Sequence, residues 1–248
     1  MAVPALRAWT RRFHPAPAAG TRLVVCPHAG GSASGYRALS AALSPTVEVH
    51  TVQYPGRQDR LAEPVIDDLH VLAERLVDVV SAIPRPFALF GHSMGASVAF
   101  EVARRLETRG VVPAALFVSA RRGPDVYKEK MHHLADDATF IAEVNLLGGT
   151  NAMVLDDPDI RQLVLPALRG DYKAIETYRY RPGPDVTCPV VALTGNADPV
   201  LTTPDVENWR EHTTGPFELE VFEGGHFYLD DHLDAVVAKI LGTLTVSP

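Results

Sequence analysis

An apolar run that ends in a glycine-flanked serine constrains the fold of this 248-residue chain more than any other feature. Residues 87–90 read Phe-Ala-Leu-Phe, residues 91–95 read Gly-His-Ser-Met-Gly, and a helical sequence follows. A serine on such a sharp strand-to-helix turn is raised above the sheet edge, and Gly91 and Gly95 are needed because a Cβ there would collide with the turn. The pattern predicts that Ser93 is a nucleophile, and an ordinary strand-to-helix turn is the alternative.

Strand-like and helix-like segments alternate along most of the chain. The apolar, β-branched runs predict strands at 22–26, 47–53, 86–90, 114–119, 189–194 and 217–222. Apolar spacing close to 3.6 predicts helices at 66–83, 96–109, 205–212 and 230–243. This alternation is typical of a mostly parallel sheet flanked by helices, and with the serine turn it predicts the α/β-hydrolase fold.

The stretch 123–185 interrupts this rhythm. It contains helical pieces but no clear strand, and it is punctuated by Gly148-Gly149, Asp157-Pro158 and Pro182-Gly183-Pro184. The length of the whole chain suits one α/β domain, since such folds commonly reach about 200–250 residues. We therefore expect a single α/β-hydrolase domain over residues 1–248, with a helical lid inserted at about 123–185.

A serine hydroxyl is a weak nucleophile near neutral pH and needs a base, and in this fold the acid and then the base follow the serine along the chain. Asp198 comes just after the expected strand 189–194, and His226 comes after 217–222. Both positions lie past the carboxyl ends of strands, where sites of open α/β sheets form. Each residue alone has the alternative of an ordinary turn or loop side chain, but their order predicts the catalytic triad Ser93, Asp198 and His226.

Acyl transfer also needs N–H groups that stabilise a developing oxyanion, and the turn aims the amide of Met94 at that place. A second glycine-rich loop follows the strand at 22–26 and contains His28, Ala29, Gly30 and Gly31. A phosphate-binding loop is the alternative, but the sequence lacks both the Gly-Lys-Ser/Thr ending and the dinucleotide-binding glycine spacing. We predict that Ala29 N–H is the second oxyanion donor and that its neighbours shape the loop.

Other residues with reactive side chains have simpler interpretations. His92 should alternate away from Ser93 and support the turn by packing or hydrogen bonding. His132 and His133 are interpreted as part of a solvated lid face and not as metal ligands, because no further ligand spacing accompanies them. Cys26 and Cys188 adjoin apolar runs and are interpreted as buried thiols. No metal and no cofactor is expected.

Charge and composition exclude several classes of partner. With 30 acidic against 23 basic residues, the net charge of −7 disfavours binding to nucleic acid or to an anionic membrane. No apolar run approaches the ~18 residues of a membrane helix. Arg11-Arg12-Phe13 resembles the start of an export signal, but residues 14–17, His-Pro-Ala-Pro, occupy the place of the required apolar region. We expect a cytoplasmic monomer.

Five segments resemble the type II thioesterases that accompany polyketide and non-ribosomal peptide synthases. They are Pro27–Ser34, Gln53–Arg57, Gly91–Ala96, Gly195–Asp198 and Gly224–Phe227. The resemblance implies an editing enzyme that removes stalled or wrong acyl groups from the phosphopantetheine arm of an acyl or peptidyl carrier protein. Cys26 stands where relatives commonly have an aromatic residue, and the lid matches least well, so the resemblance does not imply an acyl preference.

Carrier domains are usually acidic, so an acidic enzyme needs local positive charge to bind one. Two clusters in or beside the expected lid could supply it: Arg121, Arg122, Lys128 and Lys130, and Arg161, Arg169, Lys173, Arg179 and Arg181. Solvated charges without a partner are the alternative. For the whole chain, the alternatives are a general carboxylesterase or lipase, an acyl-transferring or cyclising release enzyme, and a non-catalytic carrier-binding module.

Overall fold

A seven-stranded sheet forms the centre of the computed structural model, which describes residues 2–148 and 157–246. Its strands are β1 (Thr10–Arg11), β2 (Thr21–Cys26), β3 (Val47–Val52), β4 (Phe87–His92), β5 (Leu116–Ser119), β6 (Val190–Gly195) and β7 (Phe217–Phe222). Their spatial order is β1-β3-β2-β4-β5-β6-β7, and β1 alone runs antiparallel to its neighbour. The six predicted strands are confirmed; the edge strand β1 was not predicted, because two residues are too few to show periodicity.

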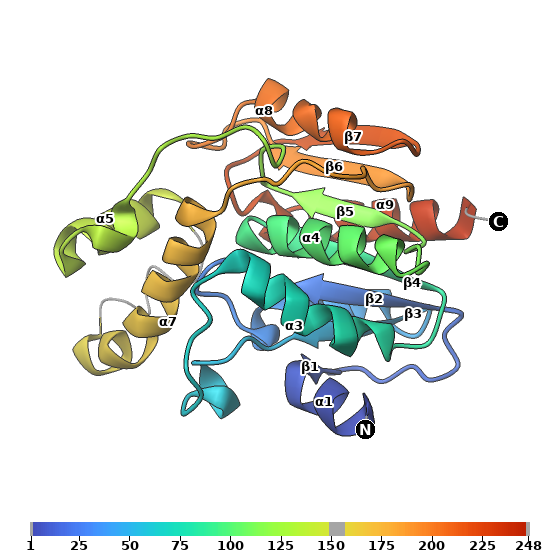
Figure 1. Ribbon diagram of the computed structural model, residues 1–248, viewed down its shortest axis with the longest axis horizontal. Helices are drawn as coiled ribbons and strands as arrows, with labels where there is room; N and C mark the ends of the chain where they lie inside the picture. The colour runs from blue at the N-terminus through green and yellow to red at the C-terminus, as the bar shows by residue number, and fades with distance from the viewer. Residues whose placement is uncertain (1, 149–156, 247–248) are drawn as a thin grey trace.

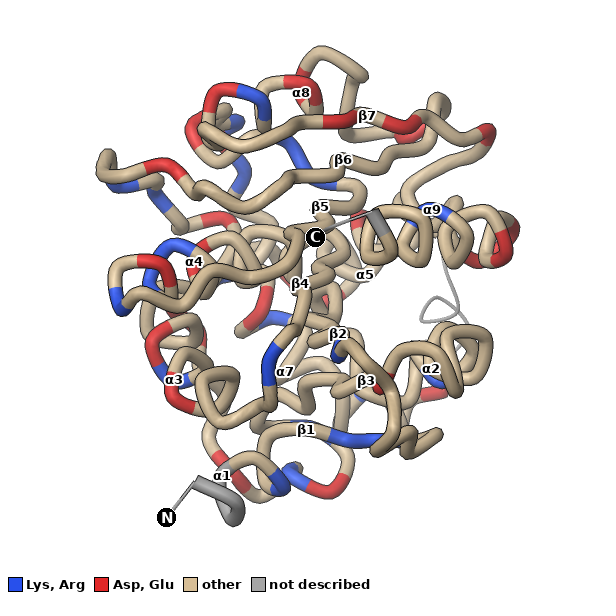
Figure 2. The backbone as a smooth tube through the Cα atoms, turned by 90° about the vertical axis from the view of Figure 1, so that its right-hand side faces the viewer, with Lys and Arg blue, Asp and Glu red and all other residues tan. Residues whose placement is uncertain are grey.

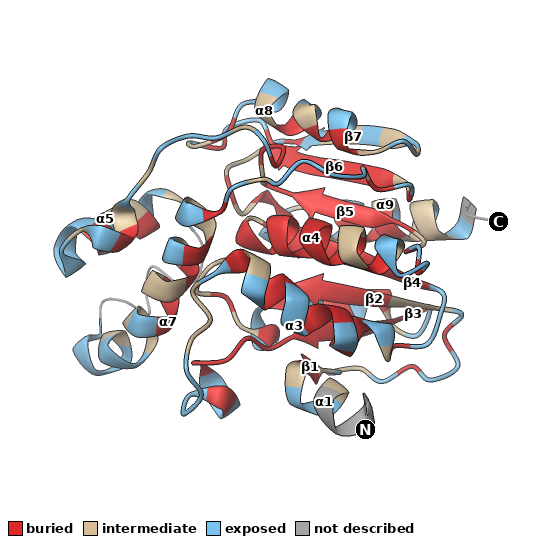
Figure 3. Ribbon diagram, viewed as in Figure 1, coloured by how far each residue is buried: buried red, intermediate tan, exposed pale blue. Residues whose placement is uncertain are grey.

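Helices cover both faces of this sheet. The main ones are α1 (Ala2–Trp9), α2 (Arg37–Leu43), α3 (Leu69–Ser81), α4 (Met94–Thr108), α8 (Thr203–Glu207) and α9 (Leu233–Val246). Helices α3 and α4 lie on one face, and α2 and α9 lie on the other (Figures 1 and 2). Strands β3, β4, β5 and β6 are buried along their whole length and β2 along most of it, as expected of parallel strands covered on both faces, whereas Phe222 is the one buried residue of the edge strand β7 (Figure 3).

The predicted helices are present, with shifted ends. Asp68 caps α3 and accepts a hydrogen bond from the N–H of Val71 at 3.0 Å. The predicted helix 205–212 is instead the short helix α8 followed by a 3₁₀ turn at Asn208–His212. The last helix begins at Leu233 and not at 230, because Tyr228–Asp230 form a separate 3₁₀ turn.

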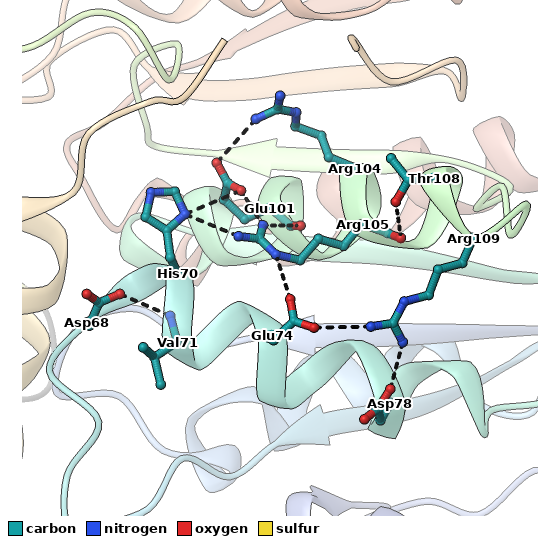
Figure 4. A network of polar contacts seen from close by, with 10 residues as sticks. All are labelled: Asp68, His70, Val71, Glu74, Asp78, Glu101, Arg104, Arg105, Thr108 and Arg109. Atoms are coloured by element: carbon teal, nitrogen blue, oxygen red, sulfur yellow. Dashed lines mark hydrogen bonds and ion pairs between the residues drawn. The ribbon is translucent and has the colours of Figure 1, made fainter. Parts of the chain in front are cut away.

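A polar network fixes α4 against α3 (Figure 4). Its centre is Glu101, which is buried on α4 and forms ion pairs with Arg104 and Arg105 of the same helix. Arg105 also bonds to Glu74 of α3 at 3.1 Å. Because the residue that precedes α4 is Ser93, this network holds the helix that follows the expected nucleophile.

The stretch 123–185 lies beyond the carboxyl ends of the central strands (Figure 1). Its described part contains a 3₁₀ turn at His132–Leu134, α5 (Asp137–Leu146) and α7 (Pro158–Thr177), and it contains no strand. Phe140 and Leu168 form a small apolar cluster of their own between α5 and α7. Residues 149–156 of the predicted lid lie outside the described residues.

Candidate active site

Ser93 occupies a strained turn between β4 and α4. Its φ of 54° lies in the left-handed region, which costs a non-glycine residue about 1–3 kcal/mol. A Cβ on Gly91 would lie 2.1 Å from the carbonyl oxygen of Gly95, and a Cβ on Gly95 would lie 2.0 Å from that of Cys26. Only glycine fits at either place, and the second contact seats the start of α4 directly on the end of β2.

We expect Gly95→Ala to lower the free energy of unfolding by at least about 2–3 kcal/mol, because the added methyl group overlaps backbone that has no room to move. Urea unfolding of the variant and the wild type measures this difference. Gly20→Ala is the matched control, since a Cβ at Gly20 meets nothing within 4 Å. Equal stability of the two variants would contradict the packing of the turn.

The structure brings the three predicted triad residues into one hydrogen-bonded row. Ser93 Oγ lies 2.9 Å from His226 Nε2, and His226 Nδ1 lies 2.6 Å from Asp198 Oδ2. The second carboxylate oxygen of Asp198 accepts a bond from the N–H of Val200 at 2.9 Å. With Nδ1 donating to the buried carboxylate, Nε2 is left as the acceptor that faces the serine hydroxyl.

Arg122 supports the loop that carries Asp198. Its guanidinium donates a hydrogen bond to the carbonyl of Val200 at 2.8 Å, and its side chain is buried. Burial lowers the pKa of Arg122, while Asp205 and Asp198 oppose that shift. Both alternatives considered for Arg122, a docking residue and a solvated charge, require an exposed side chain, and the structure contradicts both: the arginine follows β5 and turns inward to bond the neighbouring loop.

The two predicted oxyanion donors lie on either side of the serine turn. Met94 is the first residue of α4, so its N–H has no acceptor within the helix. Ala29 lines the same cavity as Ser93, on the loop after β2. Within the part of the chain that the structure describes, neither amide donates a hydrogen bond, so both are available to a ligand.

Two further histidines lie near His226: His92 packs against its ring, and His28 packs against His92 and lines the cavity. His92 is fully buried, bonds through Nδ1 to Ser119 Oγ at 2.9 Å, and lies with its ring 5.4 Å from that of His226. His28 bonds through Nδ1 to the hydroxyl of Tyr36 at 3.0 Å. Burial, and then the nearby His226 and Arg57, lower the pKa of His28 to about 3, and burial holds the pKa of His92 well below its ordinary value. The supporting role predicted for His92 is consistent with these contacts.

We expect acid to destabilise the protein through these two neutral histidines. Their folded-state pKa values lie below the unfolded value of 6.5, so the unfolded chain binds more protons as pH falls. Their contribution to stability is complete above that value and decreases from there toward about pH 3 for His28, by up to about 1.4 kcal/mol per pH unit for each histidine.

Urea unfolding of wild type, His28→Gln and His92→Gln at pH 7.5, 6.5 and 5.5 measures this dependence. Each variant should show a shallower pH slope than the wild type. An unchanged slope in both variants would show that the histidines do not titrate on unfolding.

A cavity of about 480 Å³ opens beside the serine. Its lining includes Ala29, Ser93, Arg121, Tyr178 and His226. Arg121 bonds through Nε to Ser97 Oγ at 3.1 Å, and it forms no ion pair with any described residue. Burial, and then the neighbouring Arg122, lower the pKa of Arg121 to about 9. This arginine faces the cavity, so its expected place in a surface cluster is also wrong.

The solvated lid face predicted at His132 and His133 is wrong for His133. The backbone N–H groups of His132 and His133 each donate a hydrogen bond to the carboxylate of Glu176 on α7, at 3.0 Å. The His133 side chain points inward, is buried, and bonds to the same carboxylate. Cys26 and Cys188 are free and buried, as predicted.

Sequence reasoning missed two residues near the site. They are Arg57 and Asp171 of α7, which form a buried ion pair against the loop of Ala29. Arg57 stands in one of the five segments that carry the family resemblance, but the residues gave it no role of its own. The Tyr-Pro-Gly-Arg motif at 54–57 was the available signal for Arg57. No local pattern marks Asp171, because the pair joins positions 114 residues apart.

The mostly parallel sheet, with Ser93, His226 and Asp198 joined at the carboxyl ends of its strands, defines the class as α/β-hydrolase. Within residues 2–148 and 157–246, no helix combines the length and apolar character needed to cross a membrane. Comparison with known proteins narrows the class. A family model described as thioesterase domain matches residues 21–244.

Two curated relatives come from Streptomyces. Thioesterase PikA5 of Streptomyces venezuelae is 50% identical over 246 residues, which cover 96% of this chain and 86% of the relative. The probable cadicidin biosynthesis thioesterase of Streptomyces griseus is 50% identical over 237 residues. This alignment covers 95% of this chain and 66% of that relative, which is the longer protein.

A solved structure, that of the type II thioesterase BorB from the borrelidin biosynthetic cluster, is 49% identical with a TM-score of 0.90, and the match covers 95% of this chain and 97% of that one. The chain belongs to the thioesterase family, among its type II members, and is a thioester hydrolase.

Proposed function

We propose that the protein hydrolyses aberrant or stalled acyl groups from the phosphopantetheine arm of acyl or peptidyl carrier proteins, as an editing enzyme of polyketide or non-ribosomal peptide biosynthesis. The observation that carries the proposal is the hydrogen-bonded row of Ser93, His226 and Asp198 at the edge of a cavity. The names of the relatives, which refer to biosynthetic thioesterases and a biosynthetic cluster, support the substrate class.

In this proposal His226 Nε2 takes the proton of Ser93 as Oγ attacks the thioester carbonyl carbon. The N–H groups of Met94 and Ala29 stabilise the oxyanion of the tetrahedral intermediate. The carbon–sulfur bond then breaks and the pantetheine sulfur leaves with the proton held by His226. Water, deprotonated by His226, then attacks the acyl carbon on Ser93. The bond between that carbon and Oγ breaks, Oγ takes back a proton from His226, and the free acid leaves.

The stretch 123–185 is proposed to act as a lid, because its helices lie over the carboxyl ends of the strands and line the cavity. The enzyme needs no cofactor of its own, since phosphopantetheine arrives on the carrier protein as part of the substrate. We place the enzyme in the cytoplasm as a monomer that meets its carrier transiently, and the two free thiols are compatible with a reducing compartment.

The carrier-docking residues are not assigned to the clusters expected from the sequence. Arg121 and Arg122 turn inward, and three other members already form ion pairs: Lys128 with Asp205, Arg169 with Asp137, and Lys173 with Asp67. Exposed ion pairs of this kind contribute little and are screened by salt. An acidic enzyme that binds an acidic carrier domain needs surface cations that are not already paired with its own carboxylates.

A hydrolysis panel tests the proposal. One carrier protein is loaded in turn with acetyl, propionyl, malonyl, longer acyl and aminoacyl groups, and matched oxygen esters of pantetheine are assayed beside them. We expect free acid and free carrier thiol, with higher kcat/KM for the thioesters. Preference for the oxygen esters would favour a carboxylesterase or lipase, and a product acylated on another nucleophile, or cyclised, would favour a release enzyme. No Ser93-dependent turnover on any substrate would favour a binding module.

A further inference from the structure

A buried ion pair joins α7 to the body of the protein next to the site. Arg57 donates two parallel hydrogen bonds to Asp171, from Nη1 to Oδ2 at 2.6 Å and from Nη2 to Oδ1 at 2.8 Å. Asp171 lies in the middle of α7 and is 1% exposed, and Arg57 is 7% exposed. The pair is therefore a buried, two-bonded ion pair with little exposure to water.

The same two side chains hold the loop that contains Ala29. Asp171 Oδ2 also accepts a bond from the N–H of Gly30 at 2.8 Å, and Arg57 Nη1 donates to the carbonyl of Gly31 at 3.0 Å. A turn bond from Gly31 N–H to the carbonyl of His28, at 2.9 Å, closes the loop. The peptides on the carboxyl side of Ala29 are thus fixed by three bonds.

Helix α7 also touches this loop through an apolar contact. Gly30 has a φ of +74°, and a Cβ there would lie 2.4 Å from Leu168 Cδ1. Leu168 precedes Asp171 by one helical turn, so both side chains come from one face of α7. The position of α7 therefore sets the position of Gly30 from two sides.

Stability alone does not account for this pair. Two buried charges lose their hydration, and replacing such a pair with apolar residues of similar volume is often neutral or stabilising. Apolar side chains, however, cannot accept a hydrogen bond from the N–H of Gly30 or donate one to the carbonyl of Gly31. The specific effect of the ion pair is therefore to fix the conformation of the loop that contains Gly30 and Gly31.

We propose that Asp171 and Arg57 are positioning residues that hold Ala29 N–H in place for the oxyanion, so that oxyanion stabilisation depends on the seating of α7. This inference rests on the proposed function. Neither residue touches the reacting atoms; both act through the backbone of Gly30 and Gly31.

The main test is the double variant Arg57→Met/Asp171→Leu, which removes both charges together and leaves no buried charge unpaired. We expect a melting temperature close to that of the wild type. With a short acyl-pantetheine thioester, kcat should fall about 10- to 100-fold, less than for the loss of a whole oxyanion donor, while KM stays within about threefold.

Two inhibitors separate positioning from a general structural effect. A trifluoromethyl ketone analogue forms a tetrahedral adduct with an oxyanion, and its affinity should fall in parallel with kcat. A non-hydrolysable thioether analogue has no oxyanion, and its Kd should stay unchanged. Lys173→Met is the matched control, because Lys173 also ties α7 to the body, through Asp67 at 2.6 Å, without contacting the loop. It should behave as the wild type in every measurement.

If the double variant does not fold, the single variant Arg57→Lys, which keeps a positive charge opposite Asp171, is measured in the same way. Wild-type kcat and ketone affinity in the folded variants, or equal losses for both inhibitors, would overturn the positioning role and leave the proposed function intact. Failure of the proposed function looks different: the wild type would then release acyl groups from a carrier protein no faster than Ser93→Ala does.

Discussion

Ser93→Ala is expected to lower kcat for a carrier-bound thioester by at least about 10⁴-fold, because no other group takes over the nucleophile. In the structure only Ser93 Oγ lies within hydrogen-bond distance of His226 Nε2 among the described residues. The side chain is small and the turn keeps its backbone, so the variant should unfold at nearly the wild-type temperature.

Single-turnover hydrolysis measures the loss, and labelling with a fluorophosphonate should disappear in the variant. Ser81→Ala is the matched control, because Ser81 is the last residue of α3 and, among the described residues, its hydroxyl bonds only to the carbonyl of Val77. Residual turnover within about tenfold of the wild type would remove Ser93 from the mechanism.

Asp198→Asn should lower kcat by about 10³- to 10⁴-fold with little change in KM. The carboxylate accepts a hydrogen bond from His226 Nδ1–H, with the two heavy atoms 2.6 Å apart, and so leaves Nε2 free to accept the serine proton. An asparagine amide placed toward Nδ1 donates instead, which moves the imidazole proton to Nε2 and turns the base into a donor.

The control for this substitution is Asp78→Asn, which removes an exposed carboxylate of α3 that is paired with Arg109. It should leave kcat and KM unchanged. If Asp198→Asn kept kcat within about threefold of the wild type, the carboxylate would have no part in orienting His226, and a different acid would have to be sought.

The sequence was sufficient for those parts of the fold that depend on local pattern. The six runs became strands because strands covered by helices need apolar side chains, in a nearly continuous run in β4, β5 and β6 and in alternation with polar residues in β3 and in the edge strand β7. The residues of the triad could be found because each follows a strand, and parallel strands end at the same edge of the sheet. The glycines at 91 and 95 marked the turn because a Cβ has no space there.

The parts that failed depend on side-chain direction and on distant partners. Arg121 and Arg122 read as surface cations from their charge, but the end of β5 directs them toward the cavity and the loop of Asp198. His133 was predicted on a solvated face, but it is buried because Glu176 of α7, which is distant in sequence, binds its side chain. Asp171 carried no signal, because its role exists only when α7 is packed against the loop after β2.

The two buried thiols have a practical consequence for measuring this reaction. Burial raises the pKa of Cys26 to about 12, and burial also raises the pKa of Cys188, so neither side chain is a thiolate near neutral pH. Disulfide reagents react with thiolates that they can reach. An aromatic disulfide reagent should therefore leave the folded enzyme unmodified and develop colour only with the thiol that leaves the substrate. The chain is thus suited to a continuous colorimetric assay without removal of its own cysteines.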